Sequence, residues 1–194
     1  MEKETKEKIQ VFVPLTELKD SMLLDSGQEV LALKYKGYDV SVRVCGEVRV
    51  DYKDSRFASA SKMPEELLAK FRDGSAYCDP DVNIIDNNWF EAFIDKDGEW
   101  TGRSTVVDLE DDSEEDLASG LKDMVEEYIQ DRLDDAKDLL LQHTKEHELE
   151  GVEITNEDAA SVVALRDAGN TLEEAVDIVL TGIRDCLDQG LSES

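Results

Sequence analysis

Residues 38–52 run Tyr-Asp-Val-Ser-Val-Arg-Val-Cys-Gly-Glu-Val-Arg-Val-Asp-Tyr, with valine at positions 40, 42, 44, 48 and 50. Because successive side chains of a strand point to opposite faces, this spacing predicts strands with one apolar and one polar face. The segment 29–35 alternates in the same way, and Lys36-Gly37 and Cys45-Gly46 fall where short turns would join neighbouring strands. The stretch therefore predicts an antiparallel meander with one face open to water.

The sequence on either side extends the predicted sheet. Residues 9–13 before it, and residues 82–85, 89–94 and 99–107 after it, are further candidate strands, with a turn expected at Asp86-Asn87-Asn88. Segment 65–72 follows a proline, begins with acids, ends with bases and is followed by Gly74, as expected of a short helix. Residues 1–107 are therefore predicted to form an antiparallel β-sheet with one short helix.

From Asp108 onward the pattern changes to that of helices. Apolar residues recur at helical spacing from Leu117 to Leu140, which predicts one long helix ending near His147 or Gly151. A Ser or Thr stands three residues before an acid at the expected start of each helix, at Ser113/Asp116, Thr155/Asp158 and Thr171/Glu174. The prediction is an α+β fold with two domains, the sheet and short helix at 1–107 and an acidic region of about three α-helices at 108–194.

Charge is spread unevenly along the chain. Residues 1–107 hold 21 acids and 15 bases, whereas residues 108–194 hold 27 acids and 6 bases, so most of the net charge of −27 belongs to the second half. Nucleic acid and anionic membrane surfaces repel such a chain, whereas basic proteins and cations attract it. We therefore expect basic protein partners, no direct binding of nucleic acid and no membrane binding.

Other features narrow the class of protein. No run approaches the roughly 20 apolar residues that span a bilayer, and residues 1–8 are too polar for a signal peptide, so a cytoplasmic protein is expected. Cys45, Cys78 and Cys186 lie far apart and outside any zinc-binding spacing, which favours reduced thiols. The sequence contains neither a phosphate-binding glycine motif nor a G-x-S-x-G motif. We expect no enzymatic activity and no cofactor.

Acidic residues at the start of the long helix and along it form the candidate partner-binding surface. From Glu114 to Asp138 a helix is about 38 Å long at about 1.5 Å per residue, and its 10 acids give about one carboxylate every 4 Å before its 3 bases are subtracted. One DNA strand carries about one phosphate every 3.4 Å of axis, so partial mimicry of one strand is expected. The predicted surface consists of Asp111, Asp112, Glu114, Glu115, Asp116, Asp123, Glu126, Glu127, Asp131, Asp134, Asp135 and Asp138.

In size and composition, residues 108–138 and the acidic helices after them resemble the small acidic proteins with which phages and mobile elements inhibit host defence, the anti-CRISPR and antirestriction DNA mimics. Those proteins share no common fold or motif, so no site residue is carried over from them. The resemblance implies that Asp and Glu stand in for phosphates in the basic channel of a nuclease or another DNA-binding protein. Such binding weakens as salt screens the charges.

Two further groups are candidate sites. Trp89 and Phe90 point to opposite faces of a strand, so one is expected in the core and the other exposed, where with Trp100 it would anchor a partner. The alternative is a second apolar layer or a seam against the helical half. His143 and His147 stand at i and i+4 on the predicted long helix, a spacing that can bind a transition metal, but a structural pair is favoured and no metal is expected.

The sequence thus leaves two main hypotheses for function and, as a third and least favoured one, a metal-dependent enzyme that uses His143 and His147. The first is a non-enzymatic inhibitor that binds a basic nucleic-acid-binding protein, such as a CRISPR effector or a restriction nuclease, by partial DNA mimicry. The alternative is a structural or adaptor protein that acts through helix-mediated interactions, including a homodimer formed through the helical region. In that case the acidity serves solubility.

Overall fold

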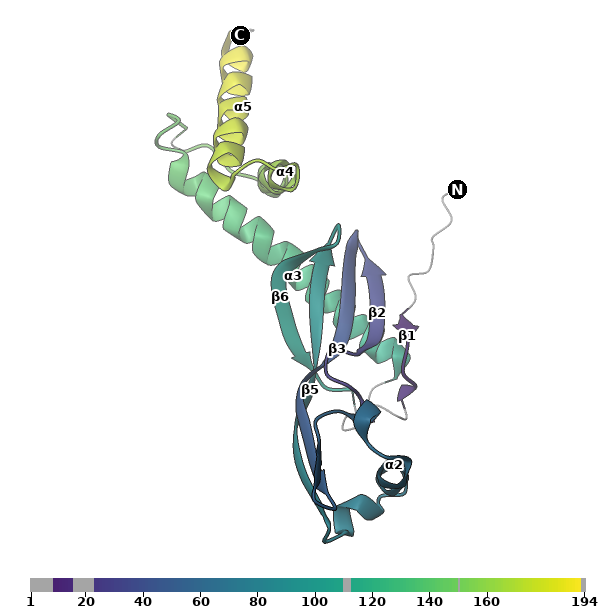
Figure 1. Ribbon diagram of the computed structural model, residues 1–194. Coiled ribbons are helices and arrows are strands. Elements are labelled where there is room, and N and C mark those ends of the chain that lie inside the picture. Colours follow the sequence, from purple (N-terminus) through teal and green to yellow (C-terminus); the bar gives the residue numbers. More distant parts are fainter. Residues whose placement is uncertain (1–8, 16–22, 110–112, 150, 193–194) are drawn as a thin grey trace. The chain divides into compact units, whose positions relative to one another are not determined.

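The computed structural model describes residues 9–15, 23–109, 113–149 and 151–192 (Figure 1). It is an α+β protein, as predicted, with an antiparallel sheet early in the chain and most of its helical residues later. The chain divides into two compact units, Met1–Val125 and Glu126–Ser194. The division falls inside the long helix α3 (Glu114–His143) and therefore does not coincide with the predicted boundary at 107/108.

The first unit is built on an antiparallel sheet whose strands lie in the order β1-β2-β3-β5-β6. The short strand β4 (Ser55–Phe57) pairs with the end of β3. Strands β2 and β6 have the predicted bounds, whereas β1 is shorter than predicted. The bounds are β1 Gln10–Val11, β2 Glu29–Tyr35, β3 Tyr38–Tyr52, β5 Val82–Lys96 and β6 Glu99–Val107.

Two of the predicted turns are wrong, because β3 and β5 are continuous strands. They pair antiparallel along their whole lengths, and Gly46 lies opposite Asn88 in the middle of the pair. Gly46 has φ of +86°, and a Cβ atom built there would lie 1.9 Å from the carbonyl oxygen of Asn87. The glycine thus marks a close approach of two backbones within the sheet rather than a chain reversal.

Two helices contribute buried side chains to the hydrophobic core of this unit. Val40, Val42 and Val44 are buried on one face, as their spacing predicted, and Leu117 and Leu121 in the first turns of α3 are buried too. Figure 1 shows the start of α3 running behind the sheet. Further along the β3–β5 pair, helix α2 (Glu65–Arg72) helps to form a separate core. That core consists of Val48, Val50, Tyr52, Met63, Leu67, Phe71 and Ala76.

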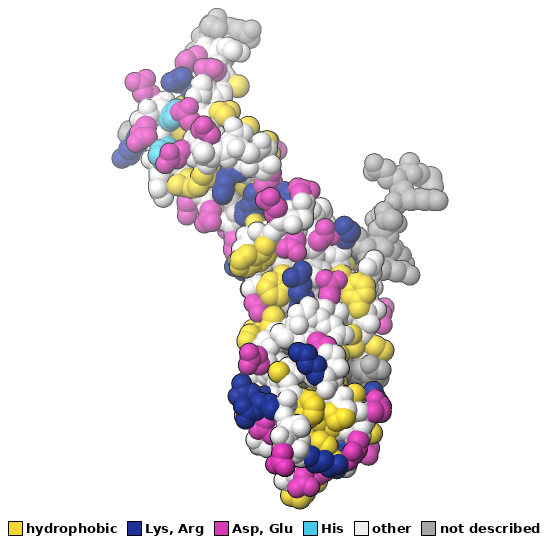
Figure 2. Space-filling view, in the orientation of Figure 1, with side chains coloured by type: hydrophobic (Ala, Val, Ile, Leu, Met, Phe, Trp, Pro, Cys, Tyr) yellow, Lys and Arg dark blue, Asp and Glu magenta, His cyan; other side chains and the backbone are white. Residues whose placement is uncertain are grey.

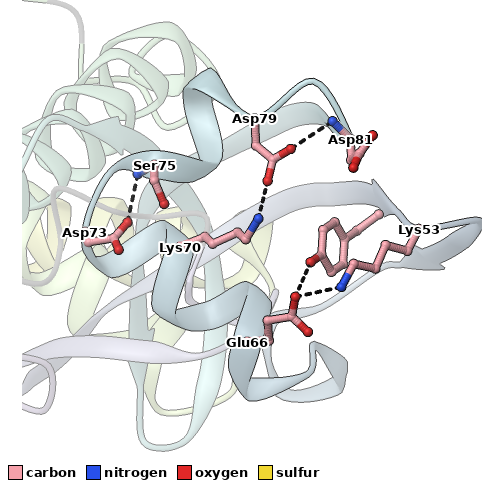
Figure 3. Close-up of polar contacts among 8 residues, drawn as sticks. Lys53, Glu66, Lys70, Asp73, Ser75, Asp79 and Asp81 are labelled. Atoms are coloured by element: carbon pink, nitrogen blue, oxygen red, sulfur yellow. Dashed lines mark hydrogen bonds and ion pairs between the residues drawn. The ribbon is translucent and has the colours of Figure 1, made fainter.

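Hydrogen bonds to two carboxylates, those of Glu66 and Asp79, connect α2 to neighbouring segments of the chain (Figure 3). Glu66 accepts hydrogen bonds from the Tyr52 hydroxyl and the Lys53 ammonium, both at 2.6 Å. Asp79 accepts from Lys70 and also from the backbone N–H of Asp81 at 2.9 Å. These bonds join α2 to the end of β3 and to the loop before β5.

The second unit is helical. It contains the later turns of α3, helix α4 (Asn156–Asp167) and helix α5 (Leu172–Ser192). Both capping pairs predicted for this unit are confirmed: Thr155 Oγ1 accepts from the Asp158 N–H, and Thr171 Oγ1 accepts from the Glu174 N–H, each at 3.2 Å. The core consists of Ala136, Leu140, Leu149, Ile154, Ala159, Val162, Ala175, Val176 and Leu180.

The long helix ends earlier than predicted. Helix α3 stops at His143, and the Leu149 N–H then donates back to the Thr144 carbonyl at 2.8 Å. Glu148 and Gly151 adopt positive φ angles of 60° and 87° in the segment that follows. This path buries Leu149 in the helical core, which a continued helix would not allow.

Candidate functional site

The predicted acidic surface is accessible wherever the structure describes it. Asp111 and Asp112 lie outside the described residues, and Glu126 is half-buried. The remaining predicted acids are all exposed: Glu114, Glu115, Asp116, Asp123, Glu127, Asp131, Asp134, Asp135 and Asp138. Solvent exposure is the condition that an electrostatic partner-binding surface must meet.

These acids fall into two groups, one in each compact unit. Glu114, Glu115, Asp116 and Asp123 belong to the first unit, and the six from Glu126 to Asp138 belong to the second. The second unit is the more acidic for its size, because it holds 19 acids and 5 bases, a net charge of −14, in little more than a third of the chain. The candidate site is therefore built on the helical unit.

Within that unit, four acids share one side of α3, and we call them the acidic face: Glu127, Asp131, Asp134 and Asp138. Residues three or four apart lie above one another on a helix, which aligns the four carboxylates. Ala136 and Leu140, which enter the helical core, project from the opposite side. The helix is therefore amphipathic here, with its charge directed away from its core.

The charge density of the acidic face is lower than that of a DNA strand. From Glu127 to Asp138 the helix rises about 17 Å at about 1.5 Å per residue, so its four carboxylates are spaced by about 5.5 Å. One DNA strand carries about one phosphate every 3.4 Å of axis. The face thus presents a row of negative charges, as a DNA strand does, but the charges are less densely spaced than the phosphates of that strand.

Several nearby acids have local structural roles. Asp167 forms an ion pair with Arg132 at 2.5 Å. One of the few basic side chains of the unit is therefore already paired with an acid. Glu174 caps α5, and hydrogen bonds from the backbone and side chain of Thr171 lower the pKa of its carboxyl. Among the described residues, Glu127 and Asp138 form no hydrogen bond or ion pair, so both carboxylates remain available to a partner.

A pocket that the sequence did not reveal lies beside the acidic face. It has a volume of about 280 Å³ and lies between α3 and the segment from α4 to the start of α5. Its lining carries both signs of charge, with Arg132 and Arg166 opposed by Asp135 and Asp138. The two arginines are far apart in sequence and meet only through the packing of α4 on α3, so no local sequence signal could have indicated them.

The two predicted aromatic anchors lie in the first unit, on β5 and β6. Phe90 is buried and Trp89 is 43% exposed, so the predicted alternation is confirmed, and Trp100 is 62% exposed. The Trp89 indole donates to Glu91 at 3.2 Å, which orients the ring. Figure 2 shows apolar side chains on this part of the molecule interspersed with charged ones.

The two histidines do not share a helix face. Helix α3 ends at His143, and His147 lies in the turn that follows, so the premise of a metal-binding i, i+4 pair is wrong. His143 Nδ1 lies 2.9 Å from Glu146, and His147 Nε2 lies 3.2 Å from Asp177. In the part of the chain that the structure describes, no three His, Cys, Asp or Glu side chains are placed to hold a metal ion.

Comparison of the chain with protein-family models, with curated proteins and with solved structures found no match. Among the described residues, no helix combines the length and apolar character needed to cross a membrane.

Proposed function

We propose that this protein is a non-enzymatic inhibitor that binds a basic nucleic-acid-binding protein, such as a CRISPR effector or a restriction nuclease, by partial mimicry of a nucleic-acid strand. The observation that carries the proposal is the acidic face of α3, where four exposed carboxylates follow one side of a helix in a unit with a net charge of −14. A basic channel built for phosphates attracts such a row of charges.

The small number of basic residues in the helical unit supports the same proposal. The helical unit holds only five bases, and Arg132 is already paired with Asp167. The negative field of the acidic face is therefore only weakly offset from within the unit. Since each exposed ion pair contributes about 0.2–1 kcal/mol, useful affinity requires several carboxylates acting together.

The proposal is tested by charge reversal with a matched control. The face variant carries Glu127→Lys, Asp131→Lys and Asp138→Lys. The control carries Glu47→Lys, Asp81→Lys and Glu99→Lys, three exposed acids of the first unit. Both variants change the net charge from −27 to −21, so they differ only in where the charge is removed.

The measurement is inhibition of DNA cleavage across a panel of purified CRISPR effectors and restriction nucleases. Wild-type protein and the control are expected to inhibit one of them, and the face variant is expected to be weaker by at least about tenfold, because three attractive pairs become repulsive. Equal inhibition by the face variant and the control would refute the acidic face as the binding surface. Inhibition of no nuclease in the panel would contradict the function.

The adaptor alternative rests on a different observation. Leu141, Ile178 and Leu187 of the helical unit are 48%, 49% and 45% exposed. If they form a homodimer interface, light scattering will show a dimer at high protein concentration, and Ile178→Ser with Leu187→Ser will dissociate it. A monomer at every concentration would contradict this alternative.

A further inference from the structure

Strand β6 forms one edge of the sheet. At the other edge β1 has only two residues, whereas β6 has nine and, among the described strands, pairs only with β5. An edge strand directs alternate backbone N–H and C=O groups outward, where a further strand can pair with them. Natural sheets usually shorten, distort or cover such edges, so the long β6 requires an explanation.

Only the end of β6 is regular enough to receive another strand. The pairing with β5 shifts register between Phe93 and Asp95, and Gly102 has φ of +84°. Beyond this irregularity, Ser104–Val107 pairs residue by residue with Phe90–Phe93. The last four residues of β6 therefore present the usable edge.

A groove of about 340 Å³ lies beside this edge, between the end of β6 and the first turns of α3, and we call it the edge groove. Thr105 and Val107 project toward α3, because they pair with residues whose side chains are buried. The α3 side is formed by Leu117, Gly120, Leu121 and Met124. The groove is therefore mainly apolar.

Gly120 keeps the groove open. A Cβ atom built on it would have no other atom within 4 Å, so the helix lacks a side chain where it faces the groove. Val106 and two acids, Asp108 and Asp116, complete the lining. An apolar floor with carboxylates beside it is complementary to an extended segment that alternates apolar residues with Lys or Arg.

We propose that the edge groove binds an extended basic peptide of a partner protein by strand addition to β6. The peptide pairs its backbone with the end of β6, places alternate apolar side chains against Gly120 and Met124, and directs a Lys or Arg to Asp108 or Asp116. Backbone pairing supplies affinity, and the groove supplies specificity. This site goes beyond the proposed inhibition, because it lies in the first unit and uses no residue of the acidic face.

The test fills the groove without weakening the fold. Gly120→Leu places a side chain in the open space, and Gly182→Leu makes the same change in α5, where a Cβ atom also meets nothing within 4 Å. Leucine favours helix over glycine, so both variants are expected to keep or raise the unfolding midpoint. The probe is a capped synthetic peptide, Lys-Val-Thr-Val-Lys-Val-Thr-Lys, and the controls are its scrambled form and a form with Glu in place of Lys.

The full-length protein is titrated with each peptide while its backbone amide resonances are followed by NMR. The probe is expected to shift the amides of 104–108 and 116–124 with a dissociation constant below about 1 mM, equally in wild type and Gly182→Leu, and at least about tenfold more weakly in Gly120→Leu. Both control peptides are expected to bind at least about tenfold more weakly than the probe.

Three results would overturn the proposal: no binding of the probe, equal binding to Gly120→Leu and wild type, or shifts confined to other residues. The face variant separates this site from the proposed function, because it is expected to bind the probe as wild type does. Loss of nuclease inhibition by the face variant with its peptide binding intact is the result that both proposals expect. Absence of nuclease inhibition in wild type leaves the peptide titration as an independent result.

Discussion

At the scale of single residues, Gly46 keeps the two longest strands in contact, and a side chain there is expected to be costly. In Gly46→Ala the new Cβ meets the Asn87 carbonyl oxygen at a positive φ, so the free energy of unfolding should fall by at least about 3 kcal/mol. Gly37→Ala has a similar φ with nothing within 4 Å, and should cost about 1 kcal/mol. Urea unfolding measures both, and equal costs would contradict the close approach.

Asp79 is expected to give the first unit a pH-dependent stability. The hydrogen bond from Lys70 is the main cause that lowers the pKa of its carboxyl, with the Asp81 N–H adding to it. A carboxyl with a lowered folded-state pKa stabilises the fold above its unfolded pKa of about 3.9, and this contribution is lost as pH falls through the folded value. Asp79→Asn should therefore lower the unfolding midpoint in urea at neutral pH.

The same comparison at progressively lower pH provides the check, because wild-type Asp79 becomes protonated as the pH falls through its lowered pKa, and its advantage over Asn is expected to disappear. Asp81→Asn serves as the control, since its exposed side chain neighbours the same loop. A difference between Asp79→Asn and wild type that stays constant with pH would contradict the role of the charge.

At the scale of elements, the helical unit depends on its capping boxes. Thr155→Ala removes the acceptor for the Asp158 N–H at the start of α4, and should lower the free energy of unfolding by about 1 kcal/mol. Ser161→Ala in the same helix is the control, because its hydroxyl only bonds back to the Glu157 carbonyl, and its effect should be near zero. Equal effects in chemical denaturation would show that the cap contributes nothing.

The same helices show which elements a sequence can predict. Capping pairs and valine spacing are local signals, so the starts of α4 and α5 and the buried side of β3 were predictable. The pairing of β3 with β5 is not local: Gly46 resembles a turn until Asn87 is known to lie against it. The early end of α3 is likewise decided by the burial of Leu149 in the helical core.

The candidate sites also divide into those that local sequence signals predict and those that depend on tertiary packing. Exposed acids follow from composition and helical spacing, and the alternation of Trp89 with Phe90 follows from strand geometry. The edge groove and the pocket beside Arg132 combine residues of different elements, so they required tertiary structure.

At the scale of the whole molecule, charge is the property that the proposed function depends on. The net charge of −27 disfavours nucleic acid itself and favours a basic partner. The division between Val125 and Glu126 assigns −14 of that charge to 69 residues. Because the acids of this unit lie mainly on helix surfaces away from its core, they act together as a field rather than as a few tight pairs.

The most direct test of nucleic-acid mimicry is the binding constant for a nuclease that the wild-type protein inhibits in the panel, measured between low and high salt with and without competing duplex DNA. Mimicry predicts binding that weakens steadily as salt rises, a smaller salt dependence for the variant with Glu127→Lys, Asp131→Lys and Asp138→Lys, and displacement by DNA. Binding that is indifferent to salt and to DNA would contradict nucleic-acid mimicry.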